Sequence, residues 1–335
     1  MKRKIFLIAE AGVNHNGNMV MAKKLIDVAK WAGADAVKFQ TFSPEEITTK
    51  QMGKANYQSK NYKKYKTQIQ MLKKLVISKK NHKVLSRYCK KKKIEFLSTG
   101  FDIENLKMLI SLGIKRIKIP SGEITNLPFL QFISNQKIPI ILSTGMSNLS
   151  EIGIALKILT KNKISKNKIT ILHCTSLYPA PFETVNLKAL ETIKKKFKTS
   201  IGYSDHTLGT EVSIAAASLG ASVIEKHFTL NRNLVGPDHK SSLEPEELKK
   251  MFLSIRNIEQ AMGNGKKIPT QKEIYQKNFF RRSIVAAKNI KIGDRLSLSN
   301  VTIKRAGQGI SALKLKKIIG KISRRNFKKD QLIKI

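Results

Sequence analysis

Short apolar runs alternate with longer amphipathic segments along most of the chain. The apolar runs are rich in β-branched and aromatic residues and occupy residues 5–10, 36–41, 95–100, 116–121, 139–145, 169–175, 200–205 and 223–229. Runs that are apolar on both faces and are separated by helical patterns are typical of parallel strands in βαβ units. Eight such units close naturally into a barrel, so the pattern predicts a (β/α)8 (TIM) barrel.

The segments between these runs have the periodicity of helices with one buried face. In residues 21–31 an apolar stripe includes Leu25 and Ile26, and Gly33 follows as a stop signal. Residues 245–262 have the same pattern. We therefore expect helices here, the second of them being the last helix of the barrel.

A change of pattern after that helix predicts a second domain. Residues 266–277 have the composition of a linker, and residues 278–335 show short strands, glycine punctuation and one short helix. The chain is thus predicted to be a barrel over 1–265 followed by a small β-rich domain over 278–335. A domain of this size is marginal alone, so it should dock on something larger.

The charge of the chain raises the question of a polyanionic partner. There are 64 Lys and Arg against 23 Asp and Glu, a formal net charge of +41. The lysines are scattered over nearly every predicted helix, which favours solvated surfaces over a nucleic-acid site. We expect no nucleic-acid partner. A basic nucleic-acid-binding protein on an inactive barrel is the alternative from another class, and its binding would depend steeply on salt.

Two further features bear on the compartment. Cys89 and Cys174 cannot build a disulfide framework, so a reducing compartment is the simpler interpretation. Glu10 interrupts the apolar start, which predicts a buried strand rather than a signal peptide. Because no apolar run approaches the ~20 residues that span a bilayer, we expect a cytoplasmic protein without a membrane partner.

Polar residues end all eight predicted strands, where barrels of this kind hold their reactive groups. In strand order they are Glu10; Lys38 and Gln40; Ser98 and Thr99; Lys118, Ser121 and Glu123; Ser143 and Thr144; His173, Thr175, Ser176 and Tyr178; Ser204, Asp205 and His206; Glu225 and His227. One polar terminus can be a simple cap, but eight together are hard to explain by packing. The sequence therefore predicts an active site at this end.

Two histidines in this set are candidate metal ligands. His206 and His227 end adjacent strands, so their imidazoles should reach one ion. Imidazole suits borderline divalent metals, and a pair leaves positions open for water and substrate. A histidine pair this far apart in sequence is, taken alone, more often structural.

A lysine and several hydroxyls indicate a phosphate pocket. Lys118 with Ser121, Ser143 and Ser204 supplies a cation and donors on neighbouring strands, and Lys38 is available for a carboxylate. The rival interpretation is a Schiff-base lysine of a class I aldolase, which needs a desolvated amine. The hydroxyl-rich, metal-adjacent setting disfavours it.

These residues lie in segments that closely resemble the sialic acid synthase family, over essentially the whole chain. The matching segments are AEAGVNHNG at 9–17, VKFQTF at 37–42, STGFD at 98–102, KIPSGE at 118–123, ILSTGM at 141–146, LHCTSLYP at 172–179, GYSDHT at 202–207, EKHFT at 225–229 and GPDHKSSLEP at 236–245. The C-terminal part resembles the antifreeze-like (SAF, β-clip) domain of the same enzymes, including KRAGQG at 304–309.

The resemblance implies a transferase that makes a nonulosonic acid. Phosphoenolpyruvate condenses with an N-acylated mannosamine-type sugar through attack of its C3 on the open-chain aldehyde, water adds at C2, and phosphate leaves by C–O cleavage. N-Acetylneuraminate synthesis from N-acetylmannosamine is the main expectation. The alternative is N,N'-diacetyllegionaminate synthesis from 2,4-diacetamido-2,4,6-trideoxymannose, which the barrel motifs do not separate from it; the GPDHKSSLEP form fits both better than a pseudaminic acid synthase.

The resemblance also implies roles for single residues. His206 and His227 would hold Mn²⁺ or Mg²⁺, and the catalytic set would be Glu10 and Glu123 near the reacting carbons with Glu225 steering water. Phosphoenolpyruvate would contact Lys38, Thr99, Lys118, Ser121, Ser143, Ser176 and Ser204. The sugar would contact Gln40, Tyr178, Asp238, Phe279 and Arg305.

Two of these sugar contacts are implied to cross between subunits. In the family the small domain reaches over the partner's barrel in a domain-swapped homodimer, and an arginine at the position of Arg305 meets the acyl group of the sugar. Phe279 would line the same pocket. At Ser176 some members have asparagine, and segment 49–68 offers no contact that can be aligned.

Overall fold

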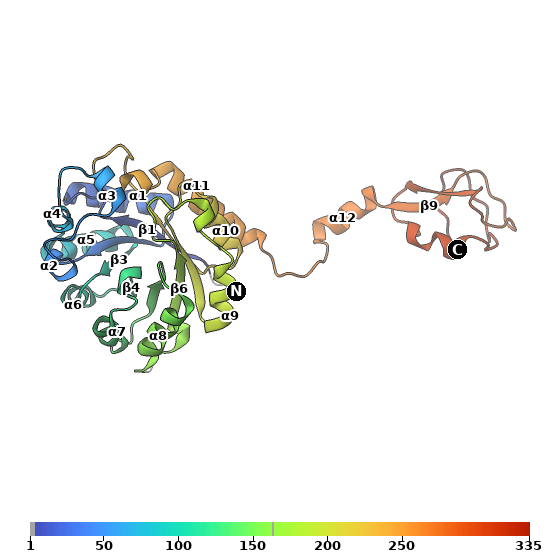
Figure 1. The fold of residues 1–335 in the computed structure, drawn as a ribbon. Coiled ribbons are helices and arrows are strands. Elements are labelled where there is room, and N and C mark those ends of the chain that lie inside the picture. The colour runs from blue at the N-terminus through green and yellow to red at the C-terminus, as the bar shows by residue number, and fades with distance from the viewer. Residues whose placement is uncertain (1–3, 163) are drawn as a thin grey trace. The chain divides into compact units, whose positions relative to one another are not determined.

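The computed structural model describes residues 4–162 and 164–335, and its first part is a closed barrel of eight parallel strands in sequence order (Figure 1). Each strand pairs with the next, and β1 closes the ring on β8 with Glu10 opposite His227. The strands are β1 Phe6–Gly12, β2 Ala36–Thr41, β3 Glu95–Gly100, β4 Ile117–Ile119, β5 Ile140–Ser143, β6 Ile169–Cys174, β7 Ser200–Asp205 and β8 Val223–His227. The predicted barrel is confirmed.

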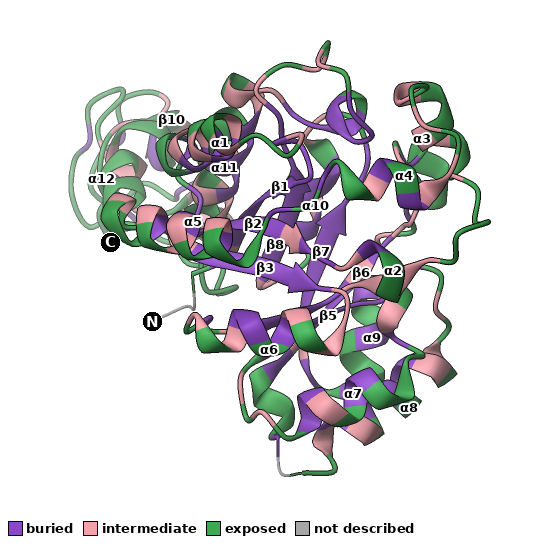
Figure 2. Cartoon of the chain, turned by 90° about the vertical axis from the view of Figure 1, so that its left-hand side faces the viewer, coloured by how far each residue is buried: buried purple, intermediate pink, exposed green. Residues whose placement is uncertain are grey.

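Helices cover the outside of this barrel (Figure 2). They are α1 Met19–Ala32, α5 Lys79–Lys92, α6 Ile103–Ser111, α7 Leu127–Ser134, α8 Leu149–Thr160, α9 Ala189–Phe197, α10 Glu211–Ser218 and α11 Pro245–Ala261. The short helices α2 Pro44–Ile47, α3 Asn56–Asn61 and α4 Gln68–Lys73 lie instead in the connection between β2 and β3, and other connections contain the 3-10 turns η1 Ser121–Glu123, η2 Lys166–Lys168, η3 Phe182–Thr184 and η4 His239–Ser241. The predicted helix at 21–31 lies within α1, which begins after the Asn18 cap and ends where Gly33 adopts a φ of 90°.

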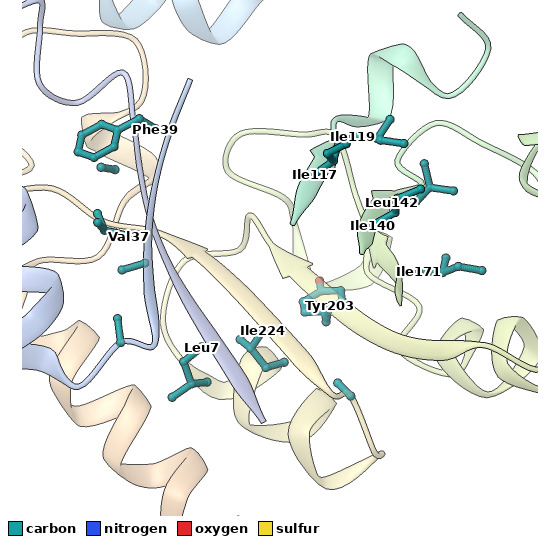
Figure 3. Close-up of a cluster of buried hydrophobic side chains, with 14 of the residues drawn as sticks. Leu7, Val37, Phe39, Ile117, Ile119, Ile140, Leu142, Ile171, Tyr203 and Ile224 are labelled. Carbon is teal, nitrogen blue, oxygen red and sulfur yellow. The ribbon is translucent and has the colours of Figure 1, made fainter. Parts of the chain in front are cut away.

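The outward faces of the strands form the main core against the helices. Figure 3 shows part of it, with Leu7, Val37, Tyr203 and Ile224 among its members. The inward faces change character along each strand. At one level Ile8, Ala36, Leu97, Ile141, Leu172 and Val223 fill the barrel. Side chains on one face of a strand recur every second residue, so the residues two positions further on also face inward. These residues are polar, as at Glu10, Lys38 and Glu225.

A separate apolar cluster lies in the long connection between β2 and β3. Phe42, Met71 and Leu75 of the connection form its centre with Val13, which follows β1, and all four are buried. The connection contains α2, α3 and α4, which have only four to six residues each. Helices this short depend on tertiary contacts, so the cluster is what holds this connection together.

The second part of the chain is a compact unit that begins at Asn264. It contains α12 Gln271–Phe280, the antiparallel strands β9 Arg282–Ala286 and β10 Val301–Arg305, the turn η5 Ala312–Lys314 and α13 Leu315–Ile318. It has its own core, which includes Ile284, Ile290 and Phe327. Most of the expected linker is helical, because Thr270 and Glu273 form a capping box that starts α12.

No helix within the described ranges is long and apolar enough to cross a membrane.

Candidate active site

Four of the polar strand ends meet around the amine of Lys38. Its Nζ lies 3.1 Å from Oε2 of Glu10 and 3.5 Å from Oε1 of Glu225, and it donates to Oγ1 of Thr99 at 2.8 Å. All four side chains are buried, and they come from β2, β1, β8 and β3. The barrel thus brings together groups that are far apart in sequence, as predicted from their places at strand ends.

Lys118 joins the same cluster from β4. Its Nζ lies 3.4 Å from Oε1 of Glu225, and Ser204 donates to that oxygen at 3.1 Å. Burial opposes ionisation of Glu225, but Lys118 and Lys38 outweigh it and lower the pKa of this carboxyl to about 2. Burial raises the pKa of Glu10 to about 7 despite Lys38. Two amines thus face one firmly ionised carboxylate, a balance that suits an anionic ligand.

Small side chains converge at the tips of β4, β5 and β6. Ser121 accepts a hydrogen bond from the backbone nitrogen of Gly145 at 2.9 Å. A Cβ at Gly145 would collide with Oγ of Ser176, so only glycine permits this approach. Ser143 is buried, and its hydroxyl has no partner among the described residues. The structure therefore gathers Ser121, Ser143 and Ser176 at the tips of β4, β5 and β6, next to the strand that carries Lys118, and leaves the Ser143 hydroxyl free.

His206 and His227 lie side by side, with ring centroids 5.5 Å apart. His206 donates from Nδ1 to the carbonyl of Thr175 at 2.7 Å, which leaves Nε2 with its lone pair. Nδ1 of His227 is buried without a partner in the described part of the chain. Burial lowers the pKa of His206 to about 4 and that of His227 well below its usual range, so both rings are neutral.

Neutral imidazoles with a free nitrogen fit a borderline divalent ion. Within residues 4–162 and 164–335 there is no group of three or more His, Cys, Asp or Glu side chains placed to hold a metal. A metal here would therefore take two protein ligands and complete its shell with water and substrate, as open catalytic sites do.

A cavity of about 230 Å³ extends from His227 toward the connection between β2 and β3. Its polar lining includes Gln40, Tyr178 and Asp238, three of the predicted sugar contacts. Its other lining residues are mostly apolar and come largely from the cluster around Phe42: Val13, Phe42, Ile47, Met71, Leu72, Leu75 and Phe101. The part of the cavity away from His227 is thus lined by this apolar cluster together with the amides of Gln58 and Gln68.

Tyr57 is a lining residue that the sequence did not reveal. It comes from the segment 49–68, and its ring stacks on Tyr178 with centroids 5.1 Å apart. Tyr178 in turn lies 4.1 Å from the ring of His206. The only signal in the sequence is an aromatic residue in a lysine-rich segment, which does not indicate a site without the fold.

Glu123 lies apart from these contacts. It sits in η1, is partly exposed, and accepts a hydrogen bond from Asn126 at 2.6 Å at the start of α7. No hydrogen bond or ion pair of the described residues joins it to the central cluster, so its catalytic role stays a prediction.

Comparison with known proteins decides the family. Residues 25–267 match the model of the NeuB family, and residues 281–335 match that of the SAF domain. The chain belongs to the NeuB family. It is an enzyme, a transferase of the acid synthase type, and the predicted resemblance is confirmed.

Three relatives of this NeuB-family protein are informative. It is 51% identical over 332 residues to the N,N'-diacetyllegionaminic acid synthase of Campylobacter jejuni, covering 99% of both chains. It is 46% identical to the enzyme of the same name from Legionella pneumophila, over 94% of this chain and 89% of the relative. The crystal structure of N-acetylneuraminic acid synthetase from Leptospira borgpetersenii superposes with a TM-score of 0.72 at 36% identity, covering 83% of this chain and 92% of that one.

Phe279 and Arg305 lie in the second unit of the NeuB-family chain. Phe279 is an exposed residue of α12, and Arg305 ends β10 with its guanidinium carbon 5.4 Å from the ring centroid of Phe280. An exposed aromatic surface beside an arginine is available to a ligand or a partner. Their contact with a sugar stays a prediction.

Asp238 gives the unliganded NeuB-family protein a predicted dependence of stability on pH. Burial raises the pKa of its carboxyl to about 7. An acid whose pKa is raised by folding holds its proton more tightly in the folded state, so the free energy of unfolding falls as pH rises from about 4 to about 7. Asp238→Asn should therefore be more stable than the parent at pH 8 and about equal to it at pH 4, as measured by thermal unfolding. Equal stability of both proteins at pH 8 would contradict this.

Proposed function

We propose that this enzyme condenses phosphoenolpyruvate with 2,4-diacetamido-2,4,6-trideoxymannose to form N,N'-diacetyllegionaminate. The observation that carries the proposal is the 51% identity to a synthase of that name over 99% of both chains. A second synthase of that name follows at 46%, whereas the sialic acid synthetase stands at 36%. The sequence left two activities open, and the comparisons favour N,N'-diacetyllegionaminate synthesis over N-acetylneuraminate synthesis, which was the main expectation.

The apolar part of the cavity lining supports a deoxy sugar. The aldehyde must lie near His206 and His227, because phosphoenolpyruvate is to be held by the lysine and serine groups beside them. The far end of the open chain then extends toward the apolar lining around Phe42 and Met71. A methyl group at C6 gains from that contact. The amides of Gln58 and Gln68, which also line the cavity, can bond to the acetamido groups.

The anionic substrate has a complementary place in the barrel. Lys118 with Ser121, Ser143, Ser176 and Ser204 would take its phosphate, and Lys38 with Thr99 its carboxylate. Lys38 and Lys118 lie on either side of Glu225, at 3.5 and 3.4 Å from its Oε1. Two buried amines here face one firmly ionised carboxylate, so the negative charge of bound phosphoenolpyruvate would balance the remaining positive charge and favour the complex.

The protein groups suit the proton and water steps of the reaction. Mn²⁺ or Mg²⁺ held by His206 and His227 would polarise the sugar aldehyde when bound. Glu10 has a pKa of about 7 and can donate or accept a proton near neutral pH. Oε2 of Glu225 is buried without a hydrogen-bond partner in the described ranges, and it can orient the water that adds to C2 before phosphate leaves.

We further propose a cytoplasmic, domain-swapped homodimer, and the second unit offers support for the swapped dimer. The resemblance places Arg305 and Phe279 of one subunit at the sugar bound by the other. Both residues are available for this in their own unit, and a partner would cover the exposed aromatic surface of α12. Closure by a partner would also exclude water from the site.

Phosphate release tests the proposed substrate. Purified protein with phosphoenolpyruvate and Mn²⁺ is assayed with each of three sugars: the 2,4-diacetamido-2,4,6-trideoxymannose, N-acetylmannosamine and the precursor of pseudaminic acid. The two sugars differ at C4 and at C6, so we expect kcat/KM for the first to exceed that for N-acetylmannosamine by about tenfold or more, which is the usual effect of even one such change in an apolar pocket. Faster turnover of N-acetylmannosamine would replace the proposed sugar with the sialic acid precursor.

A further inference from the structure

We propose that a buried ion pair between Asp205 and Lys226 positions His206 and His227, and thereby sets the affinity of the site for a divalent ion. The inference rests on the metal role of the two histidines proposed above. Asp205 and Lys226 lie next to the histidines in sequence, but their side chains point to the outside of the barrel and not into the site.

The pair bridges the tips of the two strands that carry the histidines. Asp205 and Lys226 are direct partners in the pairing of β7 with β8, and each precedes a histidine. They follow Tyr203 and Ile224 by two residues and therefore share the outward face that Figure 3 shows for those two side chains. Nζ of Lys226 lies 3.0 Å from Oδ2 of Asp205, and both side chains are 0% exposed.

The network around the pair is closely satisfied and ties four segments together. Asp205 accepts from the backbone nitrogen of Thr207 at 2.9 Å, from its hydroxyl at 2.8 Å, and from Ser213 of α10 at 2.7 Å. Lys226 also donates to the carbonyl of Thr207 at 2.6 Å. The two strand tips, the turn after β7 and helix α10 are thus held to one another.

Stability alone does not account for such a pair. Well-packed apolar residues of similar volume often replace a buried ion pair without loss of stability, whereas the directional bonds of the pair fix geometry. The geometry fixed here is the relative position of the two strand tips, and hence the 5.5 Å separation of the two rings.

His227 has the greater need of this support. His206 is oriented by its bond to the Thr175 carbonyl and by contact with Tyr178. Nδ1 of His227 has no partner among the described residues, and the ring meets Tyr178 only edge-on at a centroid distance of 5.9 Å, so no hydrogen bond fixes its direction and the position of its backbone matters more. Lys226, the preceding residue, anchors that backbone to β7. Partners that orient metal-binding histidines typically change metal affinity 10- to 100-fold.

The test separates positioning from stability by removing both charges at once. A single substitution leaves an uncompensated buried charge, so Asp205→Asn and Lys226→Met, which keep side-chain size, are combined. The full-length double variant should stay folded by circular dichroism and thermal unfolding. Its dissociation constant for Mn²⁺, measured from the electron paramagnetic resonance signal of the free ion, should rise about tenfold or more. A folded double variant with parental Mn²⁺ affinity overturns the proposal.

Three further variants make every result decisive. Ser213→Ala removes one bond to Asp205 and should weaken Mn²⁺ binding less than the double variant does; if the double variant does not fold, unchanged affinity in Ser213→Ala overturns the proposal. Ser218→Ala, on the same helix, loses only a bond to the Ala215 carbonyl and should bind Mn²⁺ normally. His206→Ala should abolish Mn²⁺ binding. If it does not, the histidines do not hold the metal. That result would contradict the proposed function itself, whereas a normal affinity in the double variant contradicts only the positioning by Asp205 and Lys226.

Discussion

Replacing His206 with alanine is expected to abolish Mn²⁺-stimulated phosphate release. The substitution removes a neutral imidazole whose Nε2 is left free by the bond from Nδ1 to the Thr175 carbonyl. Only one histidine then remains at a site where the described residues offer no third ligand. We expect activity to fall by more than about a hundredfold, beyond the loss caused by outer-sphere partners. The measurement is phosphate release after treatment with a chelator and titration with Mn²⁺.

His173→Gln is a matched control for this experiment. His173 lies on the neighbouring strand β6, and its Nε2 bonds to the carbonyl of Val185 at 2.7 Å, away from the pair. This variant should keep stimulation by Mn²⁺. Full activity of the parent in chelator, or of His206→Ala without added metal, would remove the basis for a metal site.

Replacing Lys118 with methionine is expected to cripple the use of phosphoenolpyruvate. The change removes a buried amine that lies 3.4 Å from Glu225 beside the serine hydroxyls. We expect kcat/KM for phosphoenolpyruvate to fall by about 10²–10³-fold, the usual cost of one preorganised electrostatic partner. The KM for the sugar should change little, because Lys118 does not line the sugar cavity.

The same variant should alter the titration of Glu225. Lys118 is the strongest influence opposing burial of this carboxylate, so its loss raises the pKa of Glu225. A carboxyl with a lowered pKa contributes stability above its unfolded pKa, near 4.5, that is lost as pH falls toward about 2. The variant should therefore lose less stability than the parent as pH falls from about 4.5 to about 2, as measured by thermal unfolding.

A control variant and a chemical test check that Lys118 binds phosphoenolpyruvate through its charge and does not form a Schiff base. Lys115→Met changes an exposed lysine near the other end of β4 and should leave phosphoenolpyruvate kinetics unchanged. Borohydride treatment of the parent with either substrate should leave the mass of the protein unchanged. A reduced adduct on Lys118 would instead establish the Schiff-base mechanism of a class I aldolase.

The strands were predictable because a buried parallel strand has a simple pattern. Predicted and observed limits of β2, β3 and β7 agree to the residue. The predicted runs at 116–121 and 139–145 shorten to Ile117–Ile119 and Ile140–Ser143. Pro120 cannot donate to a ladder, and the chain turns into η1 directly after it. Strand ends depend on such local chemistry more than on hydrophobicity.

The sugar end of the site was much less predictable. Tyr57 and the apolar lining come from a connection whose helices have only four to six residues. Short helices carry little periodicity and take their positions from contacts such as those of Phe42 and Met71. The sequence therefore showed which residues stand at strand ends, but not which loop residues fold over them.

Chain order and the alternation of apolar runs with helical segments were enough to predict the barrel and to place Glu10, Lys38, Lys118, Glu225 and both histidines at one end of its strands. The distances between them arise only when the barrel closes and β8 pairs with β1 and β7. Closure brings His206 and His227 to 5.5 Å and turns Asp205 and Lys226 into a buried pair behind them. Periodicity is a local property that a linear pattern records, whereas register between strands is a long-range one that packing sets.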